Sequence, residues 1–101
     1  MKKRQVVITG AGACGLMAAI MAARNGAAVT VLEQNEKPGK KICATGNGRC
    51  NFSNLARPDD AYRGEHPEFV EDALIEFSVE NTIEFFKEIG IYPLNRNGYL
   101  Y

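Results

Sequence analysis

The sequence has no long apolar run, a single histidine and no closely paired cysteines, and each of these features excludes a class of protein. No apolar stretch approaches the roughly 18 residues that cross a membrane. Residues 1–4 are basic, but the apolar stretch after them is too short for a signal peptide. The three cysteines lack C-x-x-C spacing. We therefore expect no metal site, no membrane partner, and reduced thiols in the cytoplasm.

Charge is balanced overall but unevenly distributed. Residues 1–54 carry eight Lys and Arg against two Asp and Glu, whereas residues 55–101 carry four against ten. This asymmetry is typical either of a basic half that meets an anion or of two solvated faces that attract each other. The isoelectric point of about 6.6 is too low for a typical nucleic-acid-binding domain, so we expect no nucleic-acid partner.

The first third of the chain predicts a strand, a helix and a second strand. Residues 5–8 are apolar or β-branched and end at Thr9-Gly10, and residues 14–25 are helix formers followed by Gly26, which suits the position after a helix. Residues 27–32 form a second apolar run. A crossover this short makes the two strands parallel and the connection right-handed. The fold class is therefore α/β, opening with a Rossmann-like βαβ unit.

The rest of the chain differs in composition from the first third. Residues 34–63 are rich in Gly, Pro, Asn, Lys and Arg and predict a long loop, with functional and disordered segments as the two alternatives. Further on the sequence predicts a helix opened by Pro67 and reaching Phe77, a helix over 79–89 capped by Ser78, and a hairpin with strands 91–94 and 99–101 around 95–98. Because the chain stops inside that hairpin, we expect residues 1–101 to be the incomplete N-terminal part of a larger domain.

A glycine-rich hexamer, residues 10–15, lies between the first strand and the first helix and fits G-x-G-x-x-G. Gly10 permits the tight turn, Gly12 lets the backbone approach a pyrophosphate, and Gly15 lets helix and strand pack closely. Glu33, at the end of the second strand, would accept hydrogen bonds from ribose hydroxyls. Its charge disfavours a 2′-phosphate, so NAD or FAD is expected and NADP is not. The alternative is a turn whose glycines serve geometry alone.

A second glycine element spans residues 39–51. Gly46, Asn47 and Gly48 tolerate positive φ, which lets the backbone lie against a flat or anionic ligand. Lys40, Lys41 and Arg49 add positive charge that could meet a pyrophosphate. The alternative is an ordinary polar surface loop. Cys50 reads either as a redox thiol or, as we prefer, as a small buried residue that shapes the loop.

With Gly39-Lys40-Lys41 followed by Thr45-Gly46-Asn47-Gly48-Arg49-Cys50-Asn51, the chain resembles the aminoacetone-oxidase-like (BaiN-like) flavoproteins, a branch of the two-dinucleotide-binding-domain FAD oxidoreductases. The resemblance implies a tightly held FAD as cofactor and a flavin-dependent oxidoreductase as the whole protein. The cofactor-binding residues it implies are, at the pyrophosphate, Gly10, Gly12, Ala13, Cys14 and Gly15; at the ribose, Glu33 with Gln34; and along the pyrophosphate and toward the flavin, Lys40, Lys41 and Thr45 to Asn51. No catalytic residue can be named.

The implied partners are a small-molecule substrate, NAD(P)H as an electron donor and the remainder of the protein's own chain. Two alternatives stay open: an NAD-binding dehydrogenase module, and a non-catalytic interaction fragment whose acidic half docks on a partner. Two parallel strands with open edges are marginal for independent folding. We therefore expect residues 1–101 alone to bind FAD weakly or not at all.

Overall fold

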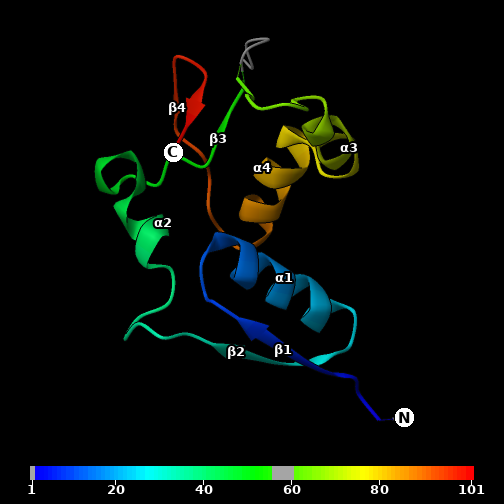
Figure 1. Cartoon of the computed structure of the whole chain (residues 1–101). Helices are drawn as coiled ribbons and strands as arrows, with labels where there is room; N and C mark the ends of the chain where they lie inside the picture. The colour runs from blue at the N-terminus through cyan, green and yellow to red at the C-terminus, as the bar shows by residue number, and fades with distance from the viewer. Residues whose placement is uncertain (1, 56–60) are drawn as a thin grey trace. The chain divides into compact units, whose positions relative to one another are not determined.

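The chain folds into two compact units, residues 1–50 and 51–101. The computed structural model describes residues 2–55 and 61–101 (Figure 1). Among these residues, no helix is both long and apolar enough to cross a bilayer.

The first unit opens with the expected βαβ arrangement. Strand β1 (Gln5–Thr9) pairs in parallel with β2 (Ala28–Leu32), in a register that runs from Gln5 opposite Ala28 to Thr9 opposite Leu32. Helix α1 (Ala13–Arg24) connects the strands and lies across one face of them (Figure 1). The predicted α/β fold with a Rossmann-like βαβ unit is therefore confirmed.

Close packing of α1 on β1 depends on Gly15. A Cβ at this position would overlap the carbonyl oxygen of Gly10 and lie 3.4 Å from Cγ2 of Ile8. On the same helix Ala19 and Ala22 are half-buried, while Ala18 and Ala23 are exposed. The small residues that pack closely are therefore confined to one narrow stripe of α1. They do not include every alanine of the helix.

The predicted loop over 34–63 is not structureless, which corrects the sequence-based expectation. It contains helix α2 (Lys40–Ala44), the 3₁₀ turn η1 (Thr45–Gly48) and strand β3 (Ser53–Asn54). These elements are too short for hydrophobic periodicity to reveal them. The positive φ expected for Gly46, Asn47 and Gly48 is confirmed, and Cys50 also has a positive φ, of 56°. Residues 56–60 of this stretch lie outside the described residues.

The second unit combines two helices with a small antiparallel sheet. Helices α3 (Phe69–Glu76) and α4 (Val79–Glu88) precede strands β4 (Asn95–Arg96) and β5 (Tyr99–Leu100), and the sheet order is β3-β5-β4. Several boundaries differ from the predicted ones, and residues 91–94, expected as the first hairpin strand, are not part of a strand. Pro67 lies in a turn before α3, closed by the Phe69 N–H donating to the His66 carbonyl. The hairpin turn is the pair Asn97-Gly98, with φ of 53° and 90°, so β4 begins inside the segment expected to turn.

Aromatic residues form the core of the second unit. Phe85 and Leu100 are buried, and the ring of Phe86 lies 4.8 Å from that of Phe52 and 5.3 Å from that of Phe85, measured between centroids. Phe69, by contrast, is 85 % exposed. Ser78 caps α4 in a capping box with Asn81, as its position before the helix predicts.

Candidate dinucleotide-binding site

The turn between β1 and α1 is fixed by hydrogen bonds at both the N–H and the carbonyl of one residue, Ala11. Its N–H donates to Oε1 of Glu33 over 2.8 Å, and its carbonyl accepts from the Gly39 N–H over 2.7 Å. The preceding Gly10 N–H donates to the Leu32 carbonyl over 2.7 Å. Ala11 is only 3 % exposed. The turn is therefore anchored to the end of β2 and to Gly39, the residue that precedes α2.

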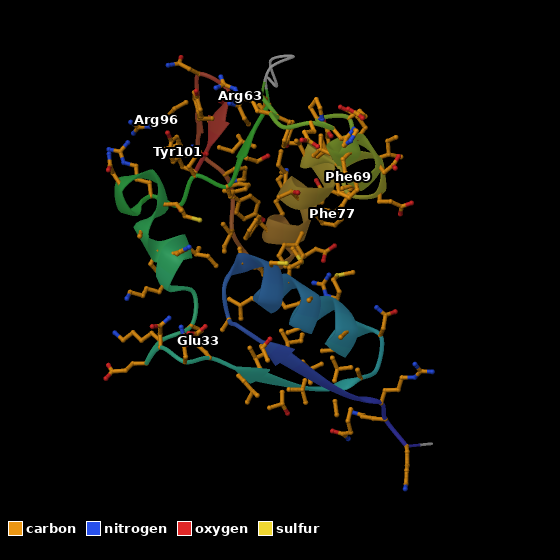
Figure 2. The ribbon with its side chains drawn as sticks, viewed as in Figure 1. Glu33, Arg63, Phe69, Phe77, Arg96 and Tyr101 are labelled. Carbon is orange, nitrogen blue, oxygen red and sulfur yellow. The ribbon has the colours of Figure 1, made fainter. Side chains whose placement is uncertain are left out.

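Glu33 faces this turn from the end of β2 (Figure 2). Its second oxygen, Oε2, accepts from the Asn35 N–H over 2.8 Å. The backbone N–H of Ala11, and next that of Asn35, hold the pKa of the carboxyl below its usual value, because both bonds favour the charged form. A carboxylate offers about four acceptor positions. Glu33 therefore retains capacity for the two hydroxyls of a ribose.

The start of α1 is open to a ligand. Gly12 is the N-cap, with φ of −84°, and a Cβ built there would meet no heavy atom within 4 Å. The first-turn amides of a helix lack intrahelical acceptors and carry the positive end of the helix dipole. Ala13, Cys14 and Gly15 occupy this first turn, which holds no acidic side chain. An anion can approach these amides without a steric or like-charge barrier.

A hollow of about 700 Å³ adjoins the carboxyl ends of β1 and β2. In open α/β sheets, ligands bind at this edge. Gln34 is exposed and lines the hollow beside Glu33. The remaining described lining residues are Thr9, Gly10, Val31, Leu32 and Asn35.

The second glycine element is tied to the turn at its start, through the Gly39–Ala11 bond. Beyond Gly39, helix α2 stands apart from α1 in Figure 1, with Lys40 and Lys41 both exposed. The Thr45 hydroxyl donates to the Ile42 carbonyl over 2.9 Å. In this conformation the segment is folded on itself rather than laid along the glycine-rich turn.

Backbone amides near the end of this element are already occupied. The Arg49 N–H donates to the Gly46 carbonyl and the Cys50 N–H to the Thr45 carbonyl. They are therefore not offered to a ligand here, whereas the Arg49 side chain is exposed. Cys50 is half-buried rather than fully buried, and Cys14 is exposed. Asn51 is the first residue of the second unit.

Sequence reasoning missed three participants. Ala11 and Asn35 supply the amides that bind Glu33, and Gly39 supplies the amide that binds Ala11. Gly39 could have been noticed in the sequence, because a glycine in a loop can mark a positive φ. Its φ is indeed 68°, a conformation that favours glycine. Ala11 acts through backbone atoms alone, so its residue type carries little information, whereas Asn35 also contacts Glu33 through its side chain.

The βαβ unit, its glycine-rich turn and the acid after β2 define the class of Rossmann-type domains that bind dinucleotides. The chain belongs to the HI0933-like family, because residues 4–101 match the family described as "HI0933-like protein Rossmann domain". This agrees with the resemblance carried by its motifs.

Curated relatives match nearly the whole chain. A 3-dehydro-bile acid delta(4,6)-reductase of Clostridium scindens is 48 % identical over 96 % of this chain and 24 % of its own length. The ribosomal RNA dihydrouridine synthase of Escherichia coli is 36 % identical over 90 % of the chain and 23 % of its own length. The synthase of the same name from Haemophilus influenzae is 40 % identical over 84 % and 21 %. The chain thus spans about a quarter of the length of these relatives.

Proposed function

We propose that this chain is the FAD-binding N-terminal segment of a flavin-dependent oxidoreductase. The observation that carries the proposal is the pairing of an open helix start at Gly12 with the Glu33 carboxylate bonded to the same turn. The first feature suits a pyrophosphate and the second suits the adenosine ribose. The relative from Clostridium scindens, named as a reductase, supports oxidoreductase chemistry.

The residues present fit the ADP half of the cofactor. Amides of Gly12 to Gly15 would bind the pyrophosphate, and the free lone pairs of Glu33 would accept from ribose hydroxyls. Lys40, Lys41 and Arg49 are exposed and would contribute positive charge to the phosphates or the flavin. When bound, the flavin supplies the hydride- or electron-carrying chemistry. We assign no proton-transfer role to any side chain of this chain.

FAD is favoured over NAD by the second glycine element, which resembles that of the aminoacetone-oxidase-like flavoproteins, while the geometry of the turn suits both cofactors. NAD binding by a dehydrogenase module is therefore the second candidate. A 2′-phosphate is disfavoured in either case, because it would lie near the Glu33 carboxylate, which is held charged.

We propose a small molecule as substrate, with NAD(P)H as electron donor, acting in the cytoplasm together with the remainder of the protein's own chain. The names of the relatives cover two chemically different targets, a bile acid and ribosomal RNA. RNA is therefore the alternative substrate class. Reduction of the bound flavin by NADH or NADPH, followed by its reoxidation with each substrate class, would distinguish them.

The test of the cofactor is the absorption spectrum of the protein at its natural length, purified without added nucleotide. A flavin spectrum whose chromophore, released on denaturation, is FAD supports the proposal. Protein that is colourless, takes up no FAD and binds NAD contradicts it and favours the dehydrogenase module. Gly12→Ala is the matched variant, because its new Cβ meets no protein atom yet enters the space needed by the pyrophosphate.

A further inference from the structure

Both oxygens of the Glu33 carboxylate are engaged by the protein itself. Oε1 accepts from the Ala11 N–H and Oε2 from the Asn35 N–H, each over 2.8 Å. On the other side of the same residue, the Ala11 carbonyl accepts from the Gly39 N–H. A side chain that served only to contact a ligand would not need these bonds. Glu33 therefore belongs to the hydrogen-bond network that holds the turn in place.

We propose that Glu33 is a positioning residue for the glycine-rich turn, which it orients through the Ala11 peptide independently of any contact with a ribose. The proposal rests on the proposed function only where it concerns ligand affinity. The effect on the turn itself can be tested without a ligand.

The physical reason lies in the residues around Ala11. Gly10 and Gly12 flank it, and both lack the Cβ that restricts φ and ψ in other residues. The peptide groups of the turn would otherwise sample many orientations. Hydrogen bonds to an ionised acceptor are roughly twice as strong as neutral ones. Bonds at both the N–H and the carbonyl of Ala11 fix the orientation of the peptide groups that lead into the first turn of α1.

No other charged side chain competes for this role among the described residues around the carboxylate. The hollow beside Glu33 is lined otherwise by uncharged residues. Glu36, Lys37 and Lys40 line a separate hollow of about 350 Å³, together with Asn35. Backbone amides, together with the Asn35 side chain, are thus the polar groups that hold Glu33 in place.

A pair of ligands separates positioning from ribose contact. ADP carries the ribose hydroxyls, whereas 2′,3′-dideoxy-ADP lacks them and keeps the diphosphate. Affinities of the protein at its natural length, stripped of bound nucleotide, would be measured for both by calorimetry for the wild type, for Glu33→Gln and for the control Glu36→Gln, which removes an exposed carboxylate three residues away.

If Glu33 positions the turn, Glu33→Gln weakens both ligands by a similar factor, on the order of tenfold, because the ionised acceptor of the Ala11 N–H is lost. Glu36→Gln leaves both affinities within about twofold of the wild type, as expected for an exposed charge. Weakened ADP binding with unchanged dideoxy-ADP binding would overturn the proposal, because it would confine Glu33 to the hydroxyls.

Amide NMR of the wild-type protein at its natural length, with alanine and asparagine selectively labelled, gives a second test that needs no ligand. The N–H resonances of Ala11 and Asn35 should titrate together with the Glu33 carboxyl, and this titration should vanish in Glu33→Gln and persist in Glu36→Gln. An Ala11 resonance that does not titrate overturns the proposal whether or not ADP binds. Titration without ADP binding leaves the positioning role intact and counts against the proposed function instead.

Discussion

At the scale of single residues, two glycines of the same turn are required for opposite reasons. Gly15 faces protein, since a Cβ there would overlap the Gly10 carbonyl oxygen, whereas Gly12 faces open space. Gly15 is therefore needed for folding, whereas we expect Gly12 to be needed for access of a ligand. The two effects can be separated by the same substitution at each position.

We expect Gly15→Ala to lower the free energy of unfolding by about 2 kcal/mol or more, because helix α1 must move away from β1 to admit the methyl group. Gly12→Ala should cost less than about 1 kcal/mol, since it only replaces an N-cap glycine by a poorer cap. Urea denaturation followed by circular dichroism measures both. Equal destabilisation by the two changes would contradict this assignment.

The pH dependence of stability should report on Glu33. Its pKa is lowered in the folded state, so the charged carboxylate favours folding at pH above the ordinary glutamate value of about 4.3. This contribution is lost as the pH falls through the lower folded-state pKa. We expect Glu33→Gln to flatten the acid side of the curve of unfolding free energy against pH. Glu36→Gln should retain the wild-type slope, and an unchanged slope in Glu33→Gln would contradict the prediction.

Sequence patterns predicted part of the candidate site. The need for glycine at position 15 and the positive φ of residues 46–48 follow from residue type, and the structure agrees. The bonds from Ala11 and Asn35 to Glu33 could not be predicted, because backbone N–H groups are common to nearly all residues. The roles of all these residues toward a cofactor remain predictions.

At the scale of secondary-structure elements, the length of each helix or strand determined whether the sequence could predict it. The strands β1 and β2 and the helices α1 and α4 carry apolar runs or caps that predict them. Strand β3 has two residues, Ser53 and Asn54, and exists because it pairs with Leu100 and Tyr99 far along the chain. Local patterns contain no trace of such a pairing. Helix α2 was expected to be loop for a different reason, because five residues are too few for hydrophobic periodicity to reveal a helix.

Helix α4 should depend measurably on its capping box. The Ser78 hydroxyl accepts from the Asn81 N–H over 3.1 Å, and the Asn81 side chain accepts from the Ser78 N–H over 2.9 Å. We expect Ser78→Ala to destabilise the second unit by about 1 kcal/mol, whereas Ser78→Thr, which keeps the acceptor, should cost less. Urea unfolding monitored by the tyrosine signal measures this. Equal losses in both variants would argue against the cap.

At the scale of the whole molecule, large apolar side chains remain exposed in both units. Val7 of β1 is 63 % exposed, and Leu32 of β2 and Ile75 of α3 are also exposed. Buried apolar residues are few among those described: Ala11, Phe85 and Leu100. A chain that buries so little apolar surface has a low free energy of unfolding. Little stabilisation is then left to hold a binding site in one conformation.

We therefore expect the isolated 101-residue chain to bind FAD weakly or not at all, while the protein at its natural length binds it tightly. Isothermal titration of both with FAD measures the difference, and Gly12→Ala in the longer protein serves as the control for site-specific binding. A micromolar or tighter dissociation constant for the isolated chain would contradict this expectation.

The bonds on both sides of Ala11 also fix how many residues can connect Glu33 to Gly39. Residues 34–38 are all exposed, and the side chains of Glu36 and Lys37 make none of the bonds that hold the turn, so these two can be varied without loss of it. Removing one of them would pull either the carboxylate or the Gly39 amide away from Ala11. The length of this segment is therefore fixed, whereas positions 36 and 37 tolerate substitution and suit a reporter group beside the site.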